Sequence, residues 1–450
     1  MTLIDRSSEP RRPSSHLLRH LARWLPLALL VGALAGSASA VFLFALEWAT
    51  ATRLAHRWLV WLLPCAGFAV GWLYLRFGRE VEAGNNLLID QIHDPDKVIP
   101  LRMAPLVLGG TVVSHLFGAS VGREGTAVQM GGALADQLTH VFRLRHEDRR
   151  MLLMAGISAG FASVFGTPLA GAVFGLEVLA LGRLHSGALR FDALLLCLVA
   201  AMTGDRVGLL WGVHHTHYAI GALPTLTSWA LLAMAIAGAA FGLAGRLFAG
   251  CTHALGGWMK AGVAYAPLRP LLGGIVIAVA AWVLPAEPYL GLGIPSIQAA
   301  FQQPAAPWDW AGKLAFTVAS LGSGFKGGEV TPLFYIGATL GNALAPLLQL
   351  PYALLAGVGF VAVFAGAANT PVASTLMAAE LFGAEVALYA GIACAVSYLC
   401  SGHTGIYRAQ RVGSGKPGRG PKAPASLRLG ELDAWRRQAR QDKRPPEQPR

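Results

Sequence analysis

The residues best suited to chemistry are acidic side chains that stand in apolar sequence. Glu124 lies between two apolar segments, in the run Gly122-Arg123-Glu124-Gly125-Thr126. A charged side chain at membrane depth costs about 2.5–3.5 kcal/mol on insertion scales, which makes this carboxyl a functional candidate. The glycines let backbone N–H groups approach a ligand, and the positive end of the following helix lies beside it. We therefore expect a site where the carboxylate and a small anion compete for the same donors. The plainer alternative is a helix cap or an ion pair with Arg123.

A second carboxylate, Glu329, lies near another helix start, in the run Gly324-Phe325-Lys326-Gly327-Gly328-Glu329-Val330-Thr331-Pro332. Pro332 suits the first turn of a helix, and Thr331 suits the N-cap position. Glu329 is either a second functional carboxylate or a glutamate that only stabilises the helix start. The plainer role of Lys326 is to extend its ammonium to the membrane interface.

Neutral hydrogen-bond donors occur at two further places. Asn85 and Asn86 follow Gly84 at the start of a short segment, and an amide N–H₂ donates to an anion without adding charge. Tyr407 closes the last apolar segment, and its phenol O–H is also a donor. The alternatives are an asparagine helix cap and a tyrosine at the membrane interface.

The composition requires a lipid environment. Of the 450 residues, 54% are hydrophobic and 13% are charged, whereas a soluble domain carries about 25% charged residues. Neither a nucleophile nor a metal-ligand cluster accompanies the carboxylates, and little intramembrane charge is present to bind an organic solute. We therefore expect an all-α polytopic membrane protein that is a transporter and not an enzyme, without cofactor or metal.

Apolar stretches fill positions 25–402 and differ in length. Those long enough to span a bilayer, at roughly 20 residues, lie at 25–46, 57–75, 227–249, 267–284 and 384–400. Shorter stretches lie at 101–117, 125–139, 168–182 and 331–347. Because backbone groups exposed to lipid cost free energy, the short helices must end inside the protein, around a cavity.

Three motifs recur in the same order at nearly one offset. Gly84-Asn85-Asn86-Leu87 is matched 207 residues later by Gly291-Leu292-Gly293-Ile294. The run at 122–126 is matched 205 residues later at 327–331. Thr167-Pro168-Leu169-Ala170 with Glu177 is matched 203 residues later by Thr370-Pro371-Val372-Ala373 with Glu380. Two halves with broken helices are typical of secondary transporters, whose substrate site lies where the broken helices meet.

The net charge of +12 is concentrated at the ends of the chain. Residues 1–23 hold five arginines against two acidic residues, and residues 408–450 hold twelve Lys or Arg against four. Basic ends favour cytoplasmic termini. The C-terminal part is expected to be a disordered tail near anionic headgroups, with nucleic-acid binding as the less favoured alternative.

The run at 25–46 is too long for a cleaved signal peptide. The expected organisation is a segment 1–24, a transport domain 25–407 with halves at 25–206 and 225–407, and a tail 408–450.

Several of these motifs resemble hallmarks of the CLC family of chloride channels and proton-coupled anion antiporters. They are Gly122-Arg123-Glu124-Gly125, the Gly-Gly-x-x-x-Pro element at Gly327–Pro332, and the late tyrosine, Tyr407. The resemblance covers about residues 25–410. It implies an inverted repeat of two halves with broken and re-entrant helices. It also implies a homodimer with one anion pathway in each subunit and with both termini in the cytoplasm.

Departures from the common CLC pattern resemble the fluoride-exporting branch. Asn85 stands where most members carry an anion-coordinating serine, and Val330 stands where most carry a phenylalanine. Glu329-Val330-Thr331 before Pro332 and Thr126 in place of proline resemble that branch as well. Glu177 is followed by Val178, so the second of two adjacent glutamates, which chloride/proton antiporters use on their inner side, is missing.

The resemblance implies a fluoride/proton antiporter in the inner (plasma) membrane of a bacterium, which exports fluoride as protons enter and confers fluoride resistance. Glu124 would be the gate, and Glu329 would help to carry protons from the inner side. The implied anion-binding residues are Gly84, Asn85, Asn86, Gly122, Arg123, Gly125, Val330, Thr331 and Tyr407. The alternative is a chloride channel or chloride/proton antiporter of the same fold.

Overall fold

The computed structural model describes residues 13–181, 191–413, 416 and 423–441. Within these residues the regular structure is helical, and β-pairing is limited to isolated bridges. The described part of the first half forms the helices α1 Pro13–Ala55, α2 Leu63–Phe77, α3 Asn85–His93, α4 Met103–Leu116, α5 Glu124–Val141, α6 His146–Phe165, α7 Pro168–Glu177 and α8 Phe191–Leu210.

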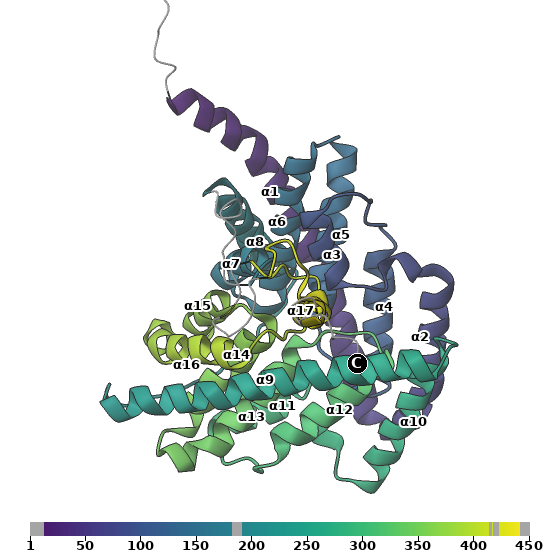
Figure 1. Cartoon of the computed structure of the whole chain (residues 1–450), viewed down its shortest axis with the longest axis vertical. Helices are drawn as coiled ribbons and strands as arrows, with labels where there is room; N and C mark the ends of the chain where they lie inside the picture. The colour runs from purple at the N-terminus through teal and green to yellow at the C-terminus, as the bar shows by residue number, and fades with distance from the viewer. Residues whose placement is uncertain (1–12, 182–190, 414–415, 417–422, 442–450) are drawn as a thin grey trace, which may run out of the picture.

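The second half repeats this order of long and short helices. Its helices are α9 Ser228–Gly262, α10 Leu268–Val283, α11 Ile294–Gln302, α12 Asp309–Ser323, α13 Val330–Leu348, α14 Tyr352–Ala368, α15 Pro371–Phe382 and α16 Ala387–Cys400. The C-terminal segment adds α17 Leu432–Gln441. Short 3₁₀ helices lie at Arg57–Leu62, Arg79–Val81, Glu287–Tyr289, Ala384–Val386 and Leu429–Glu431. In Figure 1 the teal and green helices of the second half fill the lower part of the view, and most of the purple and blue helices of the first half lie above and beside them.

Helix length separates membrane spans from buried helices only in part. Five described helices are long and apolar enough to cross a membrane, namely Arg23–Ala55, Arg57–Phe77, Asp192–Leu210, Ser228–Gly262 and Val330–Leu348. The stretches predicted to span at 267–284 and 384–400 form shorter helices, and the stretch at 331–347, predicted to be too short, forms the 19-residue α13. Most of α13 is buried in the protein, so its apolar character reflects contact with other helices as much as with lipid.

The helices that precede α7 and α15 end in the same way. α6 is followed by Gly166, with φ 70°, and α14 is followed by Asn369, with φ 60°. A left-handed residue at this position terminates a helix. Pro168 and Pro371 follow soon after and take the first position of the next helix, where no N–H partner is needed. The repeated Thr-Pro motif therefore marks a helix break in each half.

Glycines let the helices of each half approach closely. Gly131 of α5 lies against Gly156 of α6, and a Cβ on either would collide with the backbone of the other. Gly337 of α13 and Gly359 of α14 repeat this contact in the second half. The α5–α6 and α13–α14 contacts are the two most extensive between described helices. Close packing thus fixes the two helices whose N-termini meet at the candidate site.

The glutamates that follow the Thr-Pro motifs each bind the opposite half. Glu177, at the end of α7, accepts hydrogen bonds from two N–H groups in the first turn of α15, at 3.0 and 2.8 Å. Glu380 of α15 accepts two from the first turn of α7, both at 2.8 Å. Helix N-termini have unpaired N–H groups and favour negative charge. The nine-residue spacing between each proline and its glutamate therefore lets each glutamate cap the N-terminus of the matching helix in the other half.

The C-terminal segment differs from the disordered tail that its charge suggests. Residues 423–441 are described and pack on the protein, and Leu429 and Leu432 are buried in a small apolar cluster. Arg428 pairs with Asp90 of α3 at 3.0 Å. A small apolar cluster and an ion pair with α3 therefore hold part of this basic segment against the protein.

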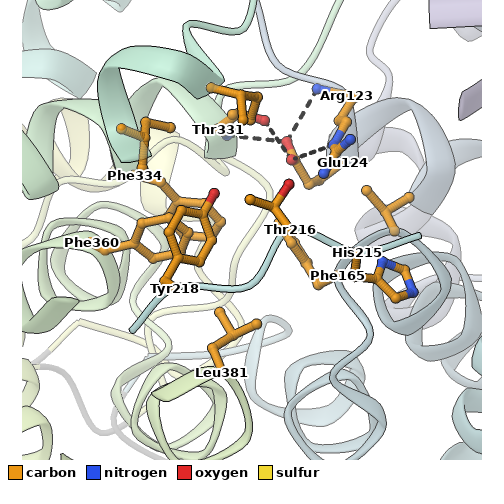
Figure 2. A pocket seen from close by; sticks show the side chains of 13 residues that line it. Arg123, Glu124, Phe165, His215, Thr216, Tyr218, Thr331, Phe334, Phe360 and Leu381 are labelled. Atoms are coloured by element: carbon orange, nitrogen blue, oxygen red, sulfur yellow. Dashed lines mark hydrogen bonds and ion pairs between the residues drawn. The ribbon is translucent and has the colours of Figure 1, made fainter. Parts of the chain in front are cut away.

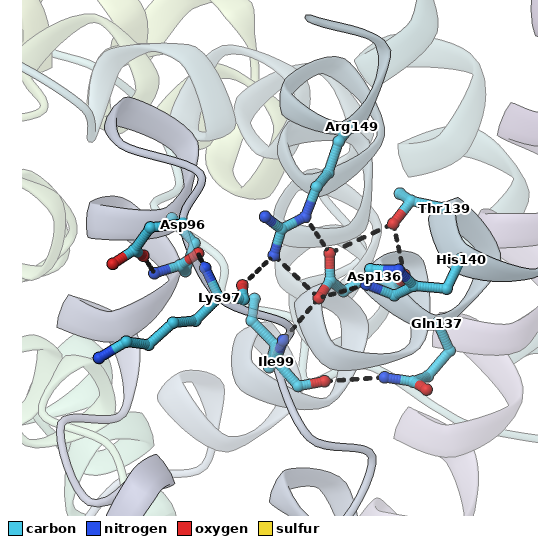
Figure 3. Close-up of polar contacts among 9 residues, drawn as sticks. Asp96, Lys97, Ile99, Asp136, Gln137, Thr139, His140 and Arg149 are labelled. Carbon is cyan, nitrogen blue, oxygen red and sulfur yellow. Dashed lines mark hydrogen bonds and ion pairs between the residues drawn. The ribbon is translucent and has the colours of Figure 1, made fainter. Parts of the chain in front are cut away.

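A buried polar cluster ties the loop between α3 and α4 to α5 and α6 (Figure 3). Asp136 of α5 has no exposed surface, and its carboxylate accepts hydrogen bonds from Arg149 at 2.6 and 3.1 Å and from the Ile99 N–H at 2.7 Å. Arg149 of α6 also donates to the Lys97 carbonyl at 2.6 Å. A buried ion pair is tolerated when further hydrogen bonds satisfy its remaining donors and acceptors. The cluster therefore fixes the position of α3, which begins at Asn85.

We predict that Arg149→Met lowers the free energy of unfolding by about 3–5 kcal/mol, because it leaves the Asp136 carboxylate buried without a charged partner. The exposed Arg145→Met should change it by no more than about 0.5 kcal/mol. The double variant Asp136→Leu/Arg149→Met should regain part of the loss. Denaturant unfolding of the purified protein in detergent measures all three. An Arg149→Met variant as stable as the wild type would show that the cluster does not hold this loop.

Candidate anion-binding site

The glycine-rich loops of the two halves pair through their backbones. The Gly122 N–H donates to the Gly328 carbonyl at 2.6 Å, and the Gly328 N–H donates to the Gly122 carbonyl at 2.7 Å. A Cβ on Gly122 would lie 2.9 Å from Pro332 Cδ and 3.0 Å from the Gly328 oxygen, so a larger residue does not fit. The pairing brings the N-termini of α5 and α13, with their unpaired N–H groups, to one place.

Glu124, the first residue of α5, has no exposed surface. Its Oε2 accepts hydrogen bonds from the backbone N–H groups of Arg123 and Thr331, both at 3.1 Å. The Thr331 hydroxyl donates to Oε1, and the Arg123 Nε lies 3.6 Å from Oε1. The carboxylate therefore occupies donors from both halves, which are the groups that a small anion would need. A pair with Arg123 accounts for only part of this arrangement.

Thr331 does not take the N-cap position that the sequence predicts. α13 begins at Val330, and Glu329 is the N-cap residue without a capping side-chain hydrogen bond. The Thr331 hydroxyl donates to Glu124 instead. A charged acceptor makes the stronger hydrogen bond, which explains why the hydroxyl faces the other half and not its own helix.

A narrow cavity of about 20 Å³, large enough for about one water molecule, lies on one side of Glu124 (Figure 2). Its walls come from both halves and from the loop between α8 and α9. The rings of Phe334 and Phe360 stack at 3.9 Å between centroids, and Tyr218 lies 5.4 Å from Phe360. Aromatic rings therefore form part of the wall of the narrow cavity that Glu124 also lines.

Asn85 stands next to the paired loops and is not a helix cap. Gly84 takes the N-cap position with φ 58°, and Asn85 is the first residue of α3. A Cβ on Gly125 would lie 3.1 Å from Asn85 Nδ2, so glycine at 125 lets the amide approach the backbone. Asn85 Oδ1 is buried and has no partner among the described residues. A rotated amide would present its N–H₂ at that open position.

The other predicted residues gather around a second cavity of about 190 Å³, which we call the middle cavity. Gly84, Asn85, Asn86, Glu329 and Tyr407 all line it. Asn86 and Glu329 also line a wider vestibule of about 770 Å³, so the two spaces adjoin. Glu124 and Thr331 line the narrow cavity. The two carboxylates therefore belong to different cavities, with the paired loops beside both.

Three of these residues differ in how free they are to bind a ligand. Tyr407 is only 3% exposed, which is unlike a tyrosine at the membrane interface, and within the described part of the chain its hydroxyl makes no hydrogen bond. The Glu329 carboxylate likewise has no hydrogen bond or ion pair there, so it is not a satisfied first-turn glutamate. Asn86, by contrast, accepts a hydrogen bond from the Ala409 N–H at 2.9 Å.

Val330 lies outside all three spaces. Its side chain is 2% exposed and belongs to the main apolar core, so it does not offer the anion contact that the sequence suggests. As the first residue of α13 it contributes through the backbone, at a helix N-terminus.

Sequence reasoning missed the loop between α8 and α9. His215, Thr216 and Tyr218 of this loop line the narrow cavity next to Glu124 (Figure 2). No glycine motif or repeat marks the loop, and the only available signal was a polar run, 214–217, between apolar stretches. The wall residues Phe334 and Phe360 gave no signal either, because they have the same apolar character as their neighbours.

Comparison with known proteins places this geometry in a family. The family described as "Voltage gated chloride channel" matches residues 66–402. The "Chloride/fluoride channel protein" of Pseudomonas syringae pv. tomato is 64% identical over 97% of each chain. The crystal structure of a CLC-type fluoride/proton antiporter aligns with a TM-score of 0.84 and 36% identity, over 87% of this chain and 98% of that one. A slow cyanobacterial Cl⁻/H⁺ antiporter aligns with a TM-score of 0.72 and 20% identity, over 85% of this chain and 94% of that one, which shows the shared fold.

The match to the family over three quarters of the chain agrees with the helical repeat and with the buried glutamate between two glycine-rich loops. The protein belongs to the CLC family, the voltage gated chloride channel family, whose members are membrane transport proteins and not enzymes.

Proposed function

We propose that the protein is a fluoride/proton antiporter that exports fluoride from a bacterial cell and so confers fluoride resistance. The observation that carries this proposal is that one carboxylate occupies donors from both halves while a second carboxylate faces a different cavity. Glu124 is held by Arg123 and Thr331, and Glu329 faces the middle cavity without a partner among the described residues. The names of the Pseudomonas relative and of the similar crystal structure support a fluoride substrate.

The charged Glu124 carboxylate and an anion are alternative occupants of the same hydrogen-bond donors. The charged carboxylate accepts hydrogen bonds from Arg123 and Thr331. A proton that arrives through the narrow cavity removes the charge, and the donors then become available to an anion. An anion bound there in turn favours protonated Glu124, and this reciprocal effect couples the two ions. Glu329 would carry the proton onward along the middle cavity.

The uncharged donors of the site suit a small, strongly hydrated anion. Such an ion leaves water only if the protein replaces most of its hydrogen bonds. The Asn85 amide, the Tyr407 hydroxyl and the Thr331 hydroxyl can each donate one or more. A larger anion such as chloride holds its water less firmly and has less need of so many donors.

We further infer that the middle cavity and vestibule face the cytoplasm. Ile406 and Arg408, next to the basic C-terminal segment, line the vestibule. Lys and Arg near membrane ends favour the cytoplasmic side. The narrow cavity would then face outward and admit protons to Glu124. The family resemblance leads us to expect a homodimer with one such pathway in each copy.

We predict that Glu124→Gln abolishes proton uptake in proteoliposomes and leaves any remaining fluoride release uncoupled from protons, because the uncharged amide cannot take up or release a proton. A fluoride electrode and an external pH probe record the two fluxes together. The matched control is Glu385→Gln, an exposed glutamate away from the cavities, which should retain both fluxes. Wild-type chloride release as fast as fluoride release would contradict the fluoride assignment and favour a chloride transporter.

We predict that Thr331→Val lowers coupled fluoride flux by about tenfold or more, since loss of one hydrogen bond to a charged group is worth about 1.5–3 kcal/mol. Thr331→Ser keeps the hydroxyl and should remain within a few-fold of wild type. The same proteoliposome assay measures both variants. Equal flux in the valine and serine variants would show that the hydroxyl bonded to Glu124 has no part in transport.

A further inference from the structure

The vestibule is lined by more cationic than anionic side chains. Arginines and lysines from five separate segments of the chain line it, together with two carboxylates, Glu82 and Glu329. The cations are Arg79, Lys260, Arg269, Lys326 and Arg408. A cleft lined by one sign of charge raises the local concentration of ions of the opposite sign. Lys326 differs from the other four because it alone also lines the middle cavity.

The side chain of Lys326, in the loop between α12 and α13, packs against α2 and α4. Its ammonium lies 4.1 Å from the ring centroid of Tyr74, on α2. Its stem packs against Gly110 of α4, where an added Cβ would come within 3.1 Å of the lysine Cβ. Tyr74 is itself buried. A cation on an aromatic face is attracted to the ring without using its N–H donors, so the position of the ammonium is fixed while those donors remain open.

Lys326 also differs from the other lysines that the structure describes in the interior. Lys313 donates to two backbone carbonyls, at 3.0 and 2.6 Å, and Lys416 donates to Ser401 Oγ at 2.8 Å. For Lys326 the described residues provide neither an oxygen within hydrogen-bonding distance nor a carboxylate within 4.0 Å. Lys313 and Lys416 therefore bind other parts of the protein, whereas Lys326 presents its ammonium to the middle cavity and the vestibule.

We propose that Lys326 forms an anion-binding position at the junction of the vestibule and the middle cavity, where a hydrated monovalent anion is held before it reaches Asn85. The same cavity contains Lys326, Glu329 and Asn85, so the anion moves between neighbouring groups of one space. A compact ammonium binds an ion that still keeps part of its water, and the uncharged donors beyond it replace that water. The identity of the anion as fluoride rests on the proposed function.

The test measures two quantities for each variant, the fluoride concentration that half-saturates transport and the maximal transport rate. Lys326→Met keeps the stem and removes the charge, and it should raise the half-saturating fluoride concentration on the vestibule side by about tenfold, with a smaller change in maximal rate. Lys326→Arg should restore at least half of that loss. Lys260→Met removes a charge at the exposed rim of the vestibule and should change the value less than twofold.

Tyr74→Phe keeps the aromatic face and should behave as wild type, whereas Tyr74→Leu should reproduce the effect of Lys326→Met. An unchanged half-saturating concentration in Lys326→Met, or an equal change in Lys260→Met, would overturn the proposal. The ratio of protons to fluoride, recorded in the same vesicles, should be the same in all variants. Wild-type vesicles without proton-coupled fluoride flux would instead overturn the proposed function, and calorimetric titration of fluoride and chloride into wild type and Lys326→Met then tests the binding position alone.

Discussion

The buried carboxylate of Glu124 is the interaction on which the rest of the structure depends. A negative charge without exposed surface is stable only when hydrogen-bond donors surround it. These donors come from the residue before α5 and from the first turn of α13, so the two halves of the chain must meet at this point. The backbone pairing of Gly122 with Gly328 makes that meeting possible, because a side chain at either position would keep the loops apart.

The surrounding architecture holds these two helix starts in place. Glycine contacts bind α5 to α6 and α13 to α14, while Glu177 and Glu380 cap helices of the opposite half. The Asp136–Arg149 cluster fixes the loop that follows α3, and α3 in turn presents Asn85 to the middle cavity. Each contact joins segments far apart in the sequence, which explains how short broken helices can keep a site rigid inside a membrane.

Sequence reasoning found the parts of this structure that depend on local chemistry or on repetition. Glycines beside a carboxylate, the Thr-Pro breaks and the matched glutamates identified the repeat and placed Glu124 at its centre. It could not show that the Thr331 hydroxyl binds Glu124 and not its own helix, because both are normal uses of threonine. It could not find Tyr218 or His215 either, since their position depends on how a loop folds over the narrow cavity. The ordered part of the C-terminal segment was missed because its few leucines are diluted among charged residues.

Proton uptake on fluoride binding tests the central claim most directly. Purified protein in detergent, weakly buffered near neutral pH, would be titrated with fluoride while a pH indicator records protons taken up. If the anion and the Glu124 carboxylate compete for one set of donors, each bound fluoride should draw up to about one proton onto the protein, and Glu124→Gln should abolish this uptake. Fluoride binding without proton uptake in the wild type would contradict the claim.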